Sequence, residues 1–134
     1  MKFPKYERYV NEADQDFVIE KDKLSSAIST LPMLHSKWLR YYYNEQFILM
    51  KKETELKQLY VKKYEFYKTG YNLEIKETKL DYFIESDEEY SKRWLAVNAQ
   101  KKIVSFLEET VKRCQNQHFI MKNLIEWEKF KAGF

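Results

Sequence analysis

The chain has 134 residues, of which 2 are glycine, 2 are proline and 1 is cysteine. So few chain-breaking residues argue against a loop-rich β-sandwich, a barrel or glycine-lined phosphate loops, and one cysteine cannot form an internal disulfide. Charged residues make up 34% of the chain, although the net charge is only +3. This content and the mean hydropathy of −0.72 indicate a large solvent-exposed surface. No stretch approaches the roughly 18 apolar residues of a membrane span, and the first residues lack the apolar core of a signal peptide. The composition therefore predicts a soluble, cytosolic, all-α protein with long and largely exposed helices.

Charge is distributed unevenly along the chain. Residues 1–32 carry a net charge of −1, residues 33–70 carry +4, residues 71–90 carry −5 and residues 91–134 carry +5. A nucleic-acid-binding domain usually has a larger basic excess, so a single subunit is expected to bind phosphates weakly. Oligomerisation would multiply its contacts along a polyanion. The acidic segment is equally suited to dock a basic partner.

The N-terminal residues are acidic and poor in apolar side chains, with Phe17 as part of the only strong apolar anchor. Such a stretch is typical of a mobile arm, which we place at residues 1–15. We expect residues 16–134 to form a single helical domain.

A long helix is predicted from Met33 to Lys68, because these 36 residues contain no glycine or proline. Pro32 stands where proline can begin a helix, and Gly70 stands where glycine can form a left-handed cap. Large apolar residues recur along the segment at helical spacing: Trp38, Tyr42, Leu49, Leu56, Leu59 and Phe66. A helix of this length spans about 54 Å, which is more than a compact domain of this size needs.

Residues 71–85 fit either a strand or a short helix. We favour a short helix over residues 76–84, because the neighbouring sequence supplies no clear partner strand. Ser86 is then predicted to cap a second long helix, with Glu89 reaching back to complete a capping box.

That second helix contains an apolar heptad repeat. The a positions are Tyr90, Val97, Val104, Val111, His118 and Ile125, and the d positions include Leu107, Cys114 and Met121. Gln100 and Lys101 interrupt the d row. The polar residues 115–117 have low helix propensity, so we expect a bend there and a last helix from Phe119 to about Lys131.

The sequence contains no motif typical of an enzyme. We find no glycine-rich phosphate loop, nucleophile elbow or paired-histidine zinc motif. Cys114 and His118 lie one helical turn apart and could supply two ligands to a metal ion. A closed zinc site needs four ligands, and the only other histidine, His35, is remote in sequence. Both residues also fit the heptad core, so packing is the favoured explanation. We therefore expect no catalytic residues, no metal and no cofactor.

Lysines and tyrosines are interleaved over residues 57–68, which we call the lysine–tyrosine segment. Cations for phosphates and rings for bases are what a sequence-tolerant binder of single strands needs. The candidate contacts are Lys57, Lys62, Lys63, Tyr64 and Lys68. A solvated helix face beside a stripe of core tyrosines explains the composition too, and composition alone favours it. The pairs Lys92–Arg93, Lys101–Lys102 and Lys112–Arg113 have the same two explanations, with the solvated face favoured more strongly.

The apolar stripes exceed what so short a chain can bury. Two or three helices folded on one another would still expose Trp38, Trp94 and Trp127. Exposed apolar faces usually contact a partner. Homo-oligomerisation through helices is therefore the best inference from the pattern.

Four segments of the chain resemble, in order and spacing, the UvsY family of phage recombination mediators. They are residues 34–39, 61–70, 84–88 and 119–133, and the resemblance extends over roughly residues 16–133. Residues 61–70 are similar to the family's pattern of basic residues followed by tyrosine and glycine. Residues 119–133 resemble its closing segment.

The resemblance implies an accessory protein of homologous recombination and repair, not an enzyme, in the cytoplasm of the infected bacterial host. Members of the family bind single-stranded DNA, form ring-like homo-oligomers, and help load the phage recombinase onto strands coated by the phage single-strand-binding protein. Lys62 matches the first of the family's two basic DNA contacts. Tyr64 matches the second, so either Lys63 substitutes for it or Tyr64 stacks on a base.

The closing segment would be the assembly element, and the domain of residues 16–134 would both bind DNA and oligomerise. Its candidate assembly residues are Phe119, Ile120, Leu124, Ile125, Trp127 and Phe130. The alternative function is a helical oligomeric scaffold or chaperone that binds proteins only. It explains the heptads, the tyrosines and the acidic segment equally well.

Overall fold

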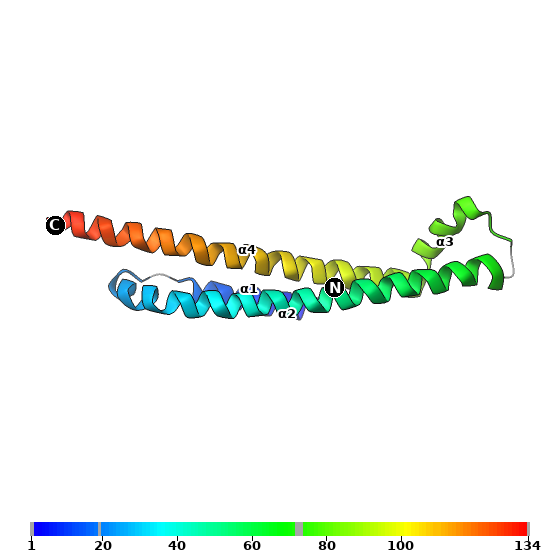
Figure 1. The fold of residues 1–134 in the computed structure, drawn as a ribbon, viewed down its shortest axis with the longest axis horizontal. Helices are drawn as coiled ribbons and strands as arrows, with labels where there is room; N and C mark the ends of the chain where they lie inside the picture. Colours follow the sequence, from blue (N-terminus) through cyan, green and yellow to red (C-terminus); the bar gives the residue numbers. More distant parts are fainter. Residues whose placement is uncertain (1, 19, 72–73, 134) are drawn as a thin grey trace. The chain divides into compact units, whose positions relative to one another are not determined.

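A computed structural model describes residues 2–18, 20–71 and 74–133, and all regular elements within these ranges are helical (Figure 1). Within these ranges the α-helices are α1 (Pro4–Asp16), α2 (Leu24–Glu65), α3 (Leu80–Ser86) and α4 (Glu88–Lys131). Short 3-10 turns precede α2 at Lys21–Lys23 and α3 at Glu77–Lys79, and a π-helical turn follows α2 at Phe66–Gly70. The predicted all-α class with long helices is confirmed. None of the helices in the described ranges is both long and apolar enough to cross a membrane.

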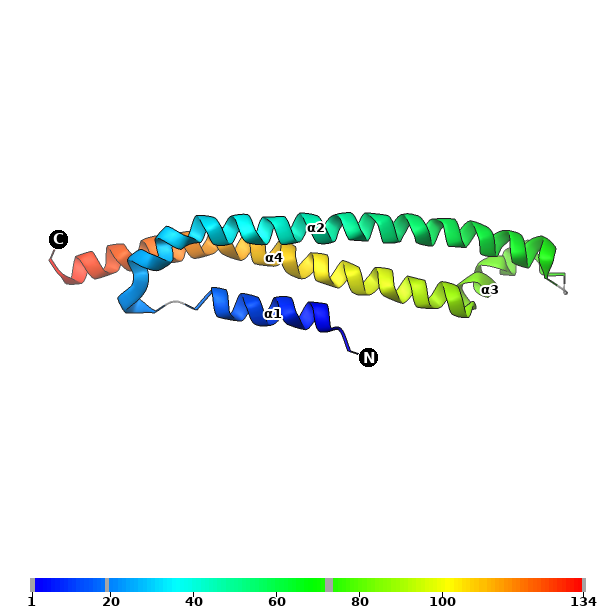
Figure 2. The ribbon, with the colours of Figure 1, turned by 90° about the horizontal axis from the view of Figure 1, so that it is seen from below.

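Helix α2 begins earlier than the sequence predicts. It starts at Leu24 and contains Pro32, so this proline does not begin the helix. Proline has no backbone N–H and disturbs the helical turn before it, and the N-terminal end of α2 changes direction in Figure 2. The 42 residues of α2 span about 63 Å.

The predicted left-handed cap at Gly70 is wrong. In the described part of the chain, the one glycine with a positive φ is Gly133, at 84°, just after α4. Helix α2 instead widens into the π-helical turn that ends at Gly70, where the Thr69 hydroxyl donates to the Glu65 carbonyl at 2.8 Å. The short helix predicted for residues 76–84 is confirmed as a 3-10 turn followed by α3, although residues 72–73 of the ambiguous stretch lie outside the described residues.

Helix α4 is capped by Asp87, not by Ser86. The Asp87 carboxylate accepts the backbone N–H of Tyr90 at 3.0 Å, whereas Ser86 is the last residue of α3. An aspartate at this position satisfies an N–H group that has no partner inside the helix, and its charge complements the helix dipole.

Helix α4 then continues for 44 residues without the bend predicted at residues 115–117. Gln117 is buried, so packing outweighs the low helix propensity of this stretch. The d row is buried from Gln100 to Met121, at Gln100, Leu107, Cys114 and Met121, whereas His118 of the a row is exposed. Gln100 therefore continues the d row as a polar member.

The chain divides into two compact units, Met1–Asn44 with Ile103–Phe134, and Glu45–Lys102. Helices α2 and α4 each contribute residues to both. The expectation of one domain over residues 16–134 stays a prediction.

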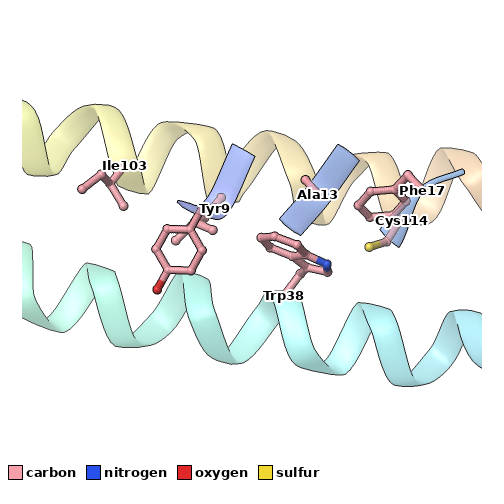
Figure 3. Close-up of a cluster of buried hydrophobic side chains, with 7 residues drawn as sticks. Tyr9, Ala13, Phe17, Trp38, Ile103 and Cys114 are labelled. Atoms are coloured by element: carbon pink, nitrogen blue, oxygen red, sulfur yellow. The ribbon is translucent and has the colours of Figure 1, made fainter. Parts of the chain in front are cut away.

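In the first unit, α1 packs beside the N-terminal part of α2 and the C-terminal part of α4 (Figure 2). Tyr9, Ala13 and Phe17 are buried against Trp38, which is 0% exposed (Figure 3). The ring centres of Tyr9 and Phe17 lie 6.2 and 6.3 Å from the ring centre of Trp38. Residues 4–15 of the segment expected to be a mobile arm thus belong to the packed helix α1. The prediction that Trp38 is exposed is wrong, because α1 covers it.

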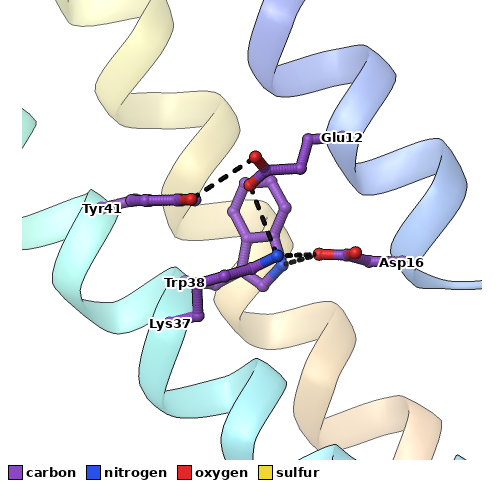
Figure 4. A network of polar contacts seen from close by, with 5 residues as sticks. All are labelled: Glu12, Asp16, Lys37, Trp38 and Tyr41. Carbon is purple, nitrogen blue, oxygen red and sulfur yellow. Dashed lines mark hydrogen bonds and ion pairs between the residues drawn. The ribbon is translucent and has the colours of Figure 1, made fainter.

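Polar contacts also attach α1 to α2 (Figure 4). The carboxylate of Asp16 accepts hydrogen bonds from the Lys37 ammonium at 2.5 Å and from the Trp38 indole N–H at 3.0 Å. Tyr41 donates to Glu12 at 3.4 Å. Burial alone would lower the pKa of Lys37, but the hydrogen bond to Asp16 and the two nearby carboxylates raise it. The contacts of α1 are therefore both apolar and polar.

The second unit contains the C-terminal part of α2, the helix α3 and the N-terminal part of α4. Leu80 and Ile84 are the buried side of α3. Gln100 and Glu45 are both buried, and the Gln100 amide donates to the Glu45 carbonyl at 2.9 Å and to its carboxylate at 3.3 Å. This unit contains the whole lysine–tyrosine segment.

Candidate nucleic-acid interface

The lysine–tyrosine segment occupies the last turns of α2 and the start of the π-helical turn, and its predicted contacts point in different directions. At about 100° per residue, Lys57, Tyr64 and Lys68 lie on one face of the helix, and Lys62 lies about 140° around the helix from Lys57. Lys57, Lys62 and Lys68 are exposed, whereas Lys63 and Tyr64 are half-buried. The predicted residues therefore do not form a single surface.

Three tyrosines of α2 and the π-helical turn donate hydrogen bonds from their hydroxyl groups to carboxylates of residues 77–87. Tyr60 bonds to Asp81, Tyr64 to Glu77 at 3.1 Å and Tyr67 to Asp87 at 2.7 Å. The hydrogen bond to Asp81, with burial and the charge of Asp81, raises the pKa of Tyr60 to about 12. These hydroxyl groups hold α3 and its flanking residues against α2.

Lys63 belongs to the same contact. Its ammonium group lies 3.3 Å from the Asp87 carboxylate and 3.1 Å from that of Glu89, and its side chain is 19% exposed. The hydrogen bond to Glu89 is the largest influence on the pKa of Lys63, which is raised despite partial burial. Because two carboxylates already neutralise the Lys63 ammonium, its attraction for a phosphate is weak.

Lys68 is paired more loosely. Its ammonium group is 3.9 Å from the Glu77 carboxylate and 5.4 Å from the centre of the Tyr64 ring. Both charged side chains of this pair are exposed, so solvent screens the attraction.

Lys57 and Lys62 have no ion pair within the described part of the chain, and both are exposed. They are the predicted contacts best placed to meet a polyanion. The sequence does not reveal that carboxylates pair with Lys63 and accept hydrogen bonds from the tyrosines. The signal was the net charge of −5 over residues 71–90, which directly follow the basic stretch.

The predicted assembly residues lie on α4 in the first unit. Phe119, Ile120, Trp127 and Phe130 are exposed, and Leu124 and Ile125 are half-buried. All except Ile125 fall within an arc of about 140° of the helix. The rings of Trp127 and Phe130 stack with centres 5.7 Å apart. The C-terminal end of α4 thus presents the surplus apolar surface that the sequence predicts.

Cys114 and His118 line a largely apolar pocket in the first unit. His35 lines the same pocket, although it is remote in sequence. Burial raises the pKa of the Cys114 thiol, as expected for an inert packing residue. The described residues contain no cluster of three or more histidine, cysteine or acidic side chains that could hold a metal ion.

Comparison with known families gives a match over most of the chain. The model of the family described as "Recombination, repair and ssDNA binding protein UvsY" matches residues 12–134. None of the curated proteins matches the chain.

Solved structures show the same fold. The crystal structure of the bacteriophage T4 recombination mediator protein UvsY in lattice type IV has a TM-score of 0.88 at 18% identity, covering 98% of this chain and 99% of that chain. In lattice type II the TM-score is 0.88 at 19% identity, covering 99% of each chain. In lattice type I it is 0.83 at 16% identity, covering 90% of this chain and 96% of that chain.

Proposed function

We propose, because this chain belongs to the UvsY family of recombination, repair and single-stranded-DNA-binding proteins, that it is a phage recombination mediator. In this role it binds single-stranded DNA and helps load the phage recombinase onto strands coated by the phage single-strand-binding protein. It acts as an accessory protein without catalytic activity, in the cytoplasm of the infected bacterial host.

The observation that supports DNA binding is the exposure of Lys57 and Lys62, which lack an ion pair among the described residues. Two cations give one subunit a weak attraction for a polyanion. A ring-like homo-oligomer assembled through the C-terminal end of α4 would repeat these cations along one strand, so that weak contacts add.

Loading the recombinase requires a difference in affinity between two states of the strand. A strand held across several subunits would have a different geometry from a strand coated by the single-strand-binding protein. If the mediator binds the first geometry more tightly, it shifts the population of strands toward the form that the recombinase can enter.

The second candidate function is an oligomeric scaffold or chaperone that binds proteins only. The pairing of Lys63 with Asp87 and Glu89 favours it, since part of the predicted DNA surface is neutralised within the chain. The exposed apolar residues near the C-terminus suit a protein partner as well as a second subunit.

Fluorescence anisotropy of labelled oligo-dT at three salt concentrations separates the two functions. For a DNA-binding mediator we expect the affinity to fall with salt, with a log–log slope of about −0.7 per phosphate contacted. The double substitution Lys57→Ala/Lys62→Ala should weaken binding and reduce this slope.

The matched control is Lys76→Ala/Lys79→Ala, which removes the same charge from two exposed lysines in the acidic segment. Equal losses in both double variants would mean that only net charge matters and would contradict a contact at Lys57 and Lys62. An absence of binding by the unmodified protein at low salt would favour the scaffold.

A further inference from the structure

A groove in the second unit combines residues of α2 and the adjacent π-helical turn with residues of α4. Its lining is Glu55, Gln58, Leu59, Lys62, Lys63, Phe66, Glu89 and Arg93. We call it the Arg93 groove. It lies away from the helix face that bears Lys57, Tyr64 and Lys68, because Lys62 is about 140° around α2 from Lys57.

The α2 side of the groove follows from residue spacing. Glu55, Leu59, Lys62 and Phe66 are separated by four, three and four residues, which places them on one helical stripe. Leu59 is buried and forms the floor, while Phe66 remains 47% exposed. The stripe therefore presents an exposed cation one turn before an exposed aromatic ring.

The α4 side is supplied by Glu89 and Arg93, one turn apart. Glu89 is already bound to Lys63, at 3.1 Å. Arg93 is exposed and has no ion pair among the described residues. Its neighbour Lys92, in contrast, pairs with Glu88 at 3.3 Å.

The charges of the groove do not cancel. The lining contains three cations and two carboxylates. Lys63 is paired with Glu89 of the lining and with Asp87 outside it, so the cations without an ion pair among the described residues are Lys62 and Arg93, against the carboxylate of Glu55. Two cations from different helices and one accessible ring match the chemistry of a nucleotide. A guanidinium and an ammonium attract a phosphate, and an aromatic ring stacks on a base.

We infer that the Arg93 groove binds one nucleotide of single-stranded DNA, with Lys62 and Arg93 on the backbone phosphate and the Phe66 ring against a base. The inference rests on the proposed function and extends it, because it adds Arg93 and Phe66 to the strand path. It also separates Lys62 from the tyrosine face of α2.

The phosphate contact is tested with Arg93→Ala and Lys92→Ala, which remove one positive charge from adjacent exposed residues of the same helix. In oligo-dT anisotropy, we expect Arg93→Ala to weaken binding about tenfold at low salt and to reduce the magnitude of the log–log salt slope by about 0.7 per subunit engaged. Lys92→Ala should leave the slope unchanged. Equal slopes for the two variants would overturn the assignment of Arg93.

The stacking contact is tested with Phe66→Ala and Phe66→Leu on two probes, oligo-dT and an abasic strand of the same length. Both variants should bind oligo-dT about tenfold more weakly and bind the abasic strand as the unmodified protein does, because stacking needs a base. Equal losses on both probes would indicate a packing defect and would overturn the stacking role. Phe66→Leu retains apolar volume, and circular dichroism confirms that each variant is folded.

Failure of this inference is distinguishable from failure of the proposed function. If the unmodified protein binds oligo-dT with salt dependence but the Arg93 and Phe66 variants match their controls, the groove is not part of the strand path and the mediator function stands. If the unmodified protein binds neither probe, both are overturned. Binding of an acidic peptide but of neither DNA probe would assign the groove to a protein ligand instead.

Discussion

The ammonium group of Lys63 lies 3.3 Å from the Asp87 carboxylate, and that same carboxylate caps helix α4 through the backbone N–H of Tyr90. It also accepts the Tyr67 hydroxyl at 2.7 Å. One side chain thus joins α2, the π-helical turn and the first turn of α4.

Replacement of Asp87 by alanine should destabilise the protein by about 1–2 kcal/mol, because the cap and two charge-assisted hydrogen bonds are lost. Asp87→Asn should cost less, since asparagine is also a good cap. Urea unfolding followed by circular dichroism measures the difference. Glu88→Ala is the control, because it removes an exposed carboxylate next to Asp87 and should change stability by only about 0.5 kcal/mol. Equal costs for Asp87→Ala and Glu88→Ala would contradict the capping role.

The stabilisation by Asp87 should depend on pH. Burial alone would raise the pKa of Asp87, but hydrogen bonds from Tyr90, Tyr67 and Lys63 lower it below its ordinary value. A carboxylate whose pKa is lower in the folded than in the unfolded state stabilises the fold above the unfolded pKa of about 3.9, and loses this effect as pH falls through the folded pKa. The stability difference between the unmodified protein and Asp87→Asn should therefore be constant near neutral pH and decline from about pH 5 downward. A difference that is independent of pH down to pH 2 would contradict this origin.

Removal of the Glu77 charge should strengthen DNA binding. The Glu77 carboxylate accepts a hydrogen bond from the Tyr64 hydroxyl and lies 3.9 Å from the Lys68 ammonium. Glu77→Gln therefore frees Lys68 and removes a negative charge that would repel DNA phosphates beside the lysine–tyrosine segment. We expect an affinity for oligo-dT several-fold higher at low salt, corresponding to about 1 kcal/mol. Glu74→Gln removes the same charge from an exposed residue nearby and should have a smaller effect. Equal gains would show that only net charge matters.

Assembly should depend on the exposed aromatic residues at the end of α4. Trp127→Ala/Phe130→Ala removes the stacked pair and should shift the protein toward smaller species in sedimentation velocity, because interface aromatics carry much of the binding energy. Tyr82→Ala is the control, since Tyr82 is an aromatic residue of α3 that is as exposed as Phe130. An unchanged sedimentation profile for the double variant would place the assembly surface elsewhere.

Packing of α1 should contribute to stability. Trp38→Ala empties a fully buried site beneath Tyr9 and Phe17, and we expect a loss of about 3–5 kcal/mol in the free energy of unfolding. Trp94→Ala, at a half-exposed tryptophan, should cost about 1 kcal/mol or less. Urea unfolding measures both. Similar losses at the two sites would mean that α1 does not bury Trp38 in solution.

The long helices were predictable because their signal is local. The spacing of apolar residues from Trp38 to Leu59 and the heptad from Val97 to Met121 require only helical geometry. The role of α1 was not predictable in the same way. Its few apolar residues, Tyr9 and Ala13, become a buried face only when Trp38 is placed opposite them, and that contact joins distant parts of the sequence.

The candidate interface was predictable only in part for a related reason. The sequence identifies the basic residues of α2, but it does not show that Asp87 and Glu89 pair with Lys63, whereas Lys62 is exposed and has no ion pair among the described residues. Similarly, Arg93 looks like its neighbour Lys92 in sequence, and only the packing of α4 beside α2 places the two in different surroundings.

The buried pair of Gln100 and Glu45 has a consequence for helix alignment. Apolar seams repeat every turn, so they alone would permit α2 and α4 to slide past each other by one turn, about 5.4 Å, at small energetic penalty. Such a slide would separate the Gln100 amide from both of its acceptors and leave a buried polar group unsatisfied. A single polar residue in an apolar seam selects one register in this manner. Gln100 therefore favours the one alignment of α2 and α4 in which Arg93, two turns before it on α4, lines the same groove as Lys62 of α2.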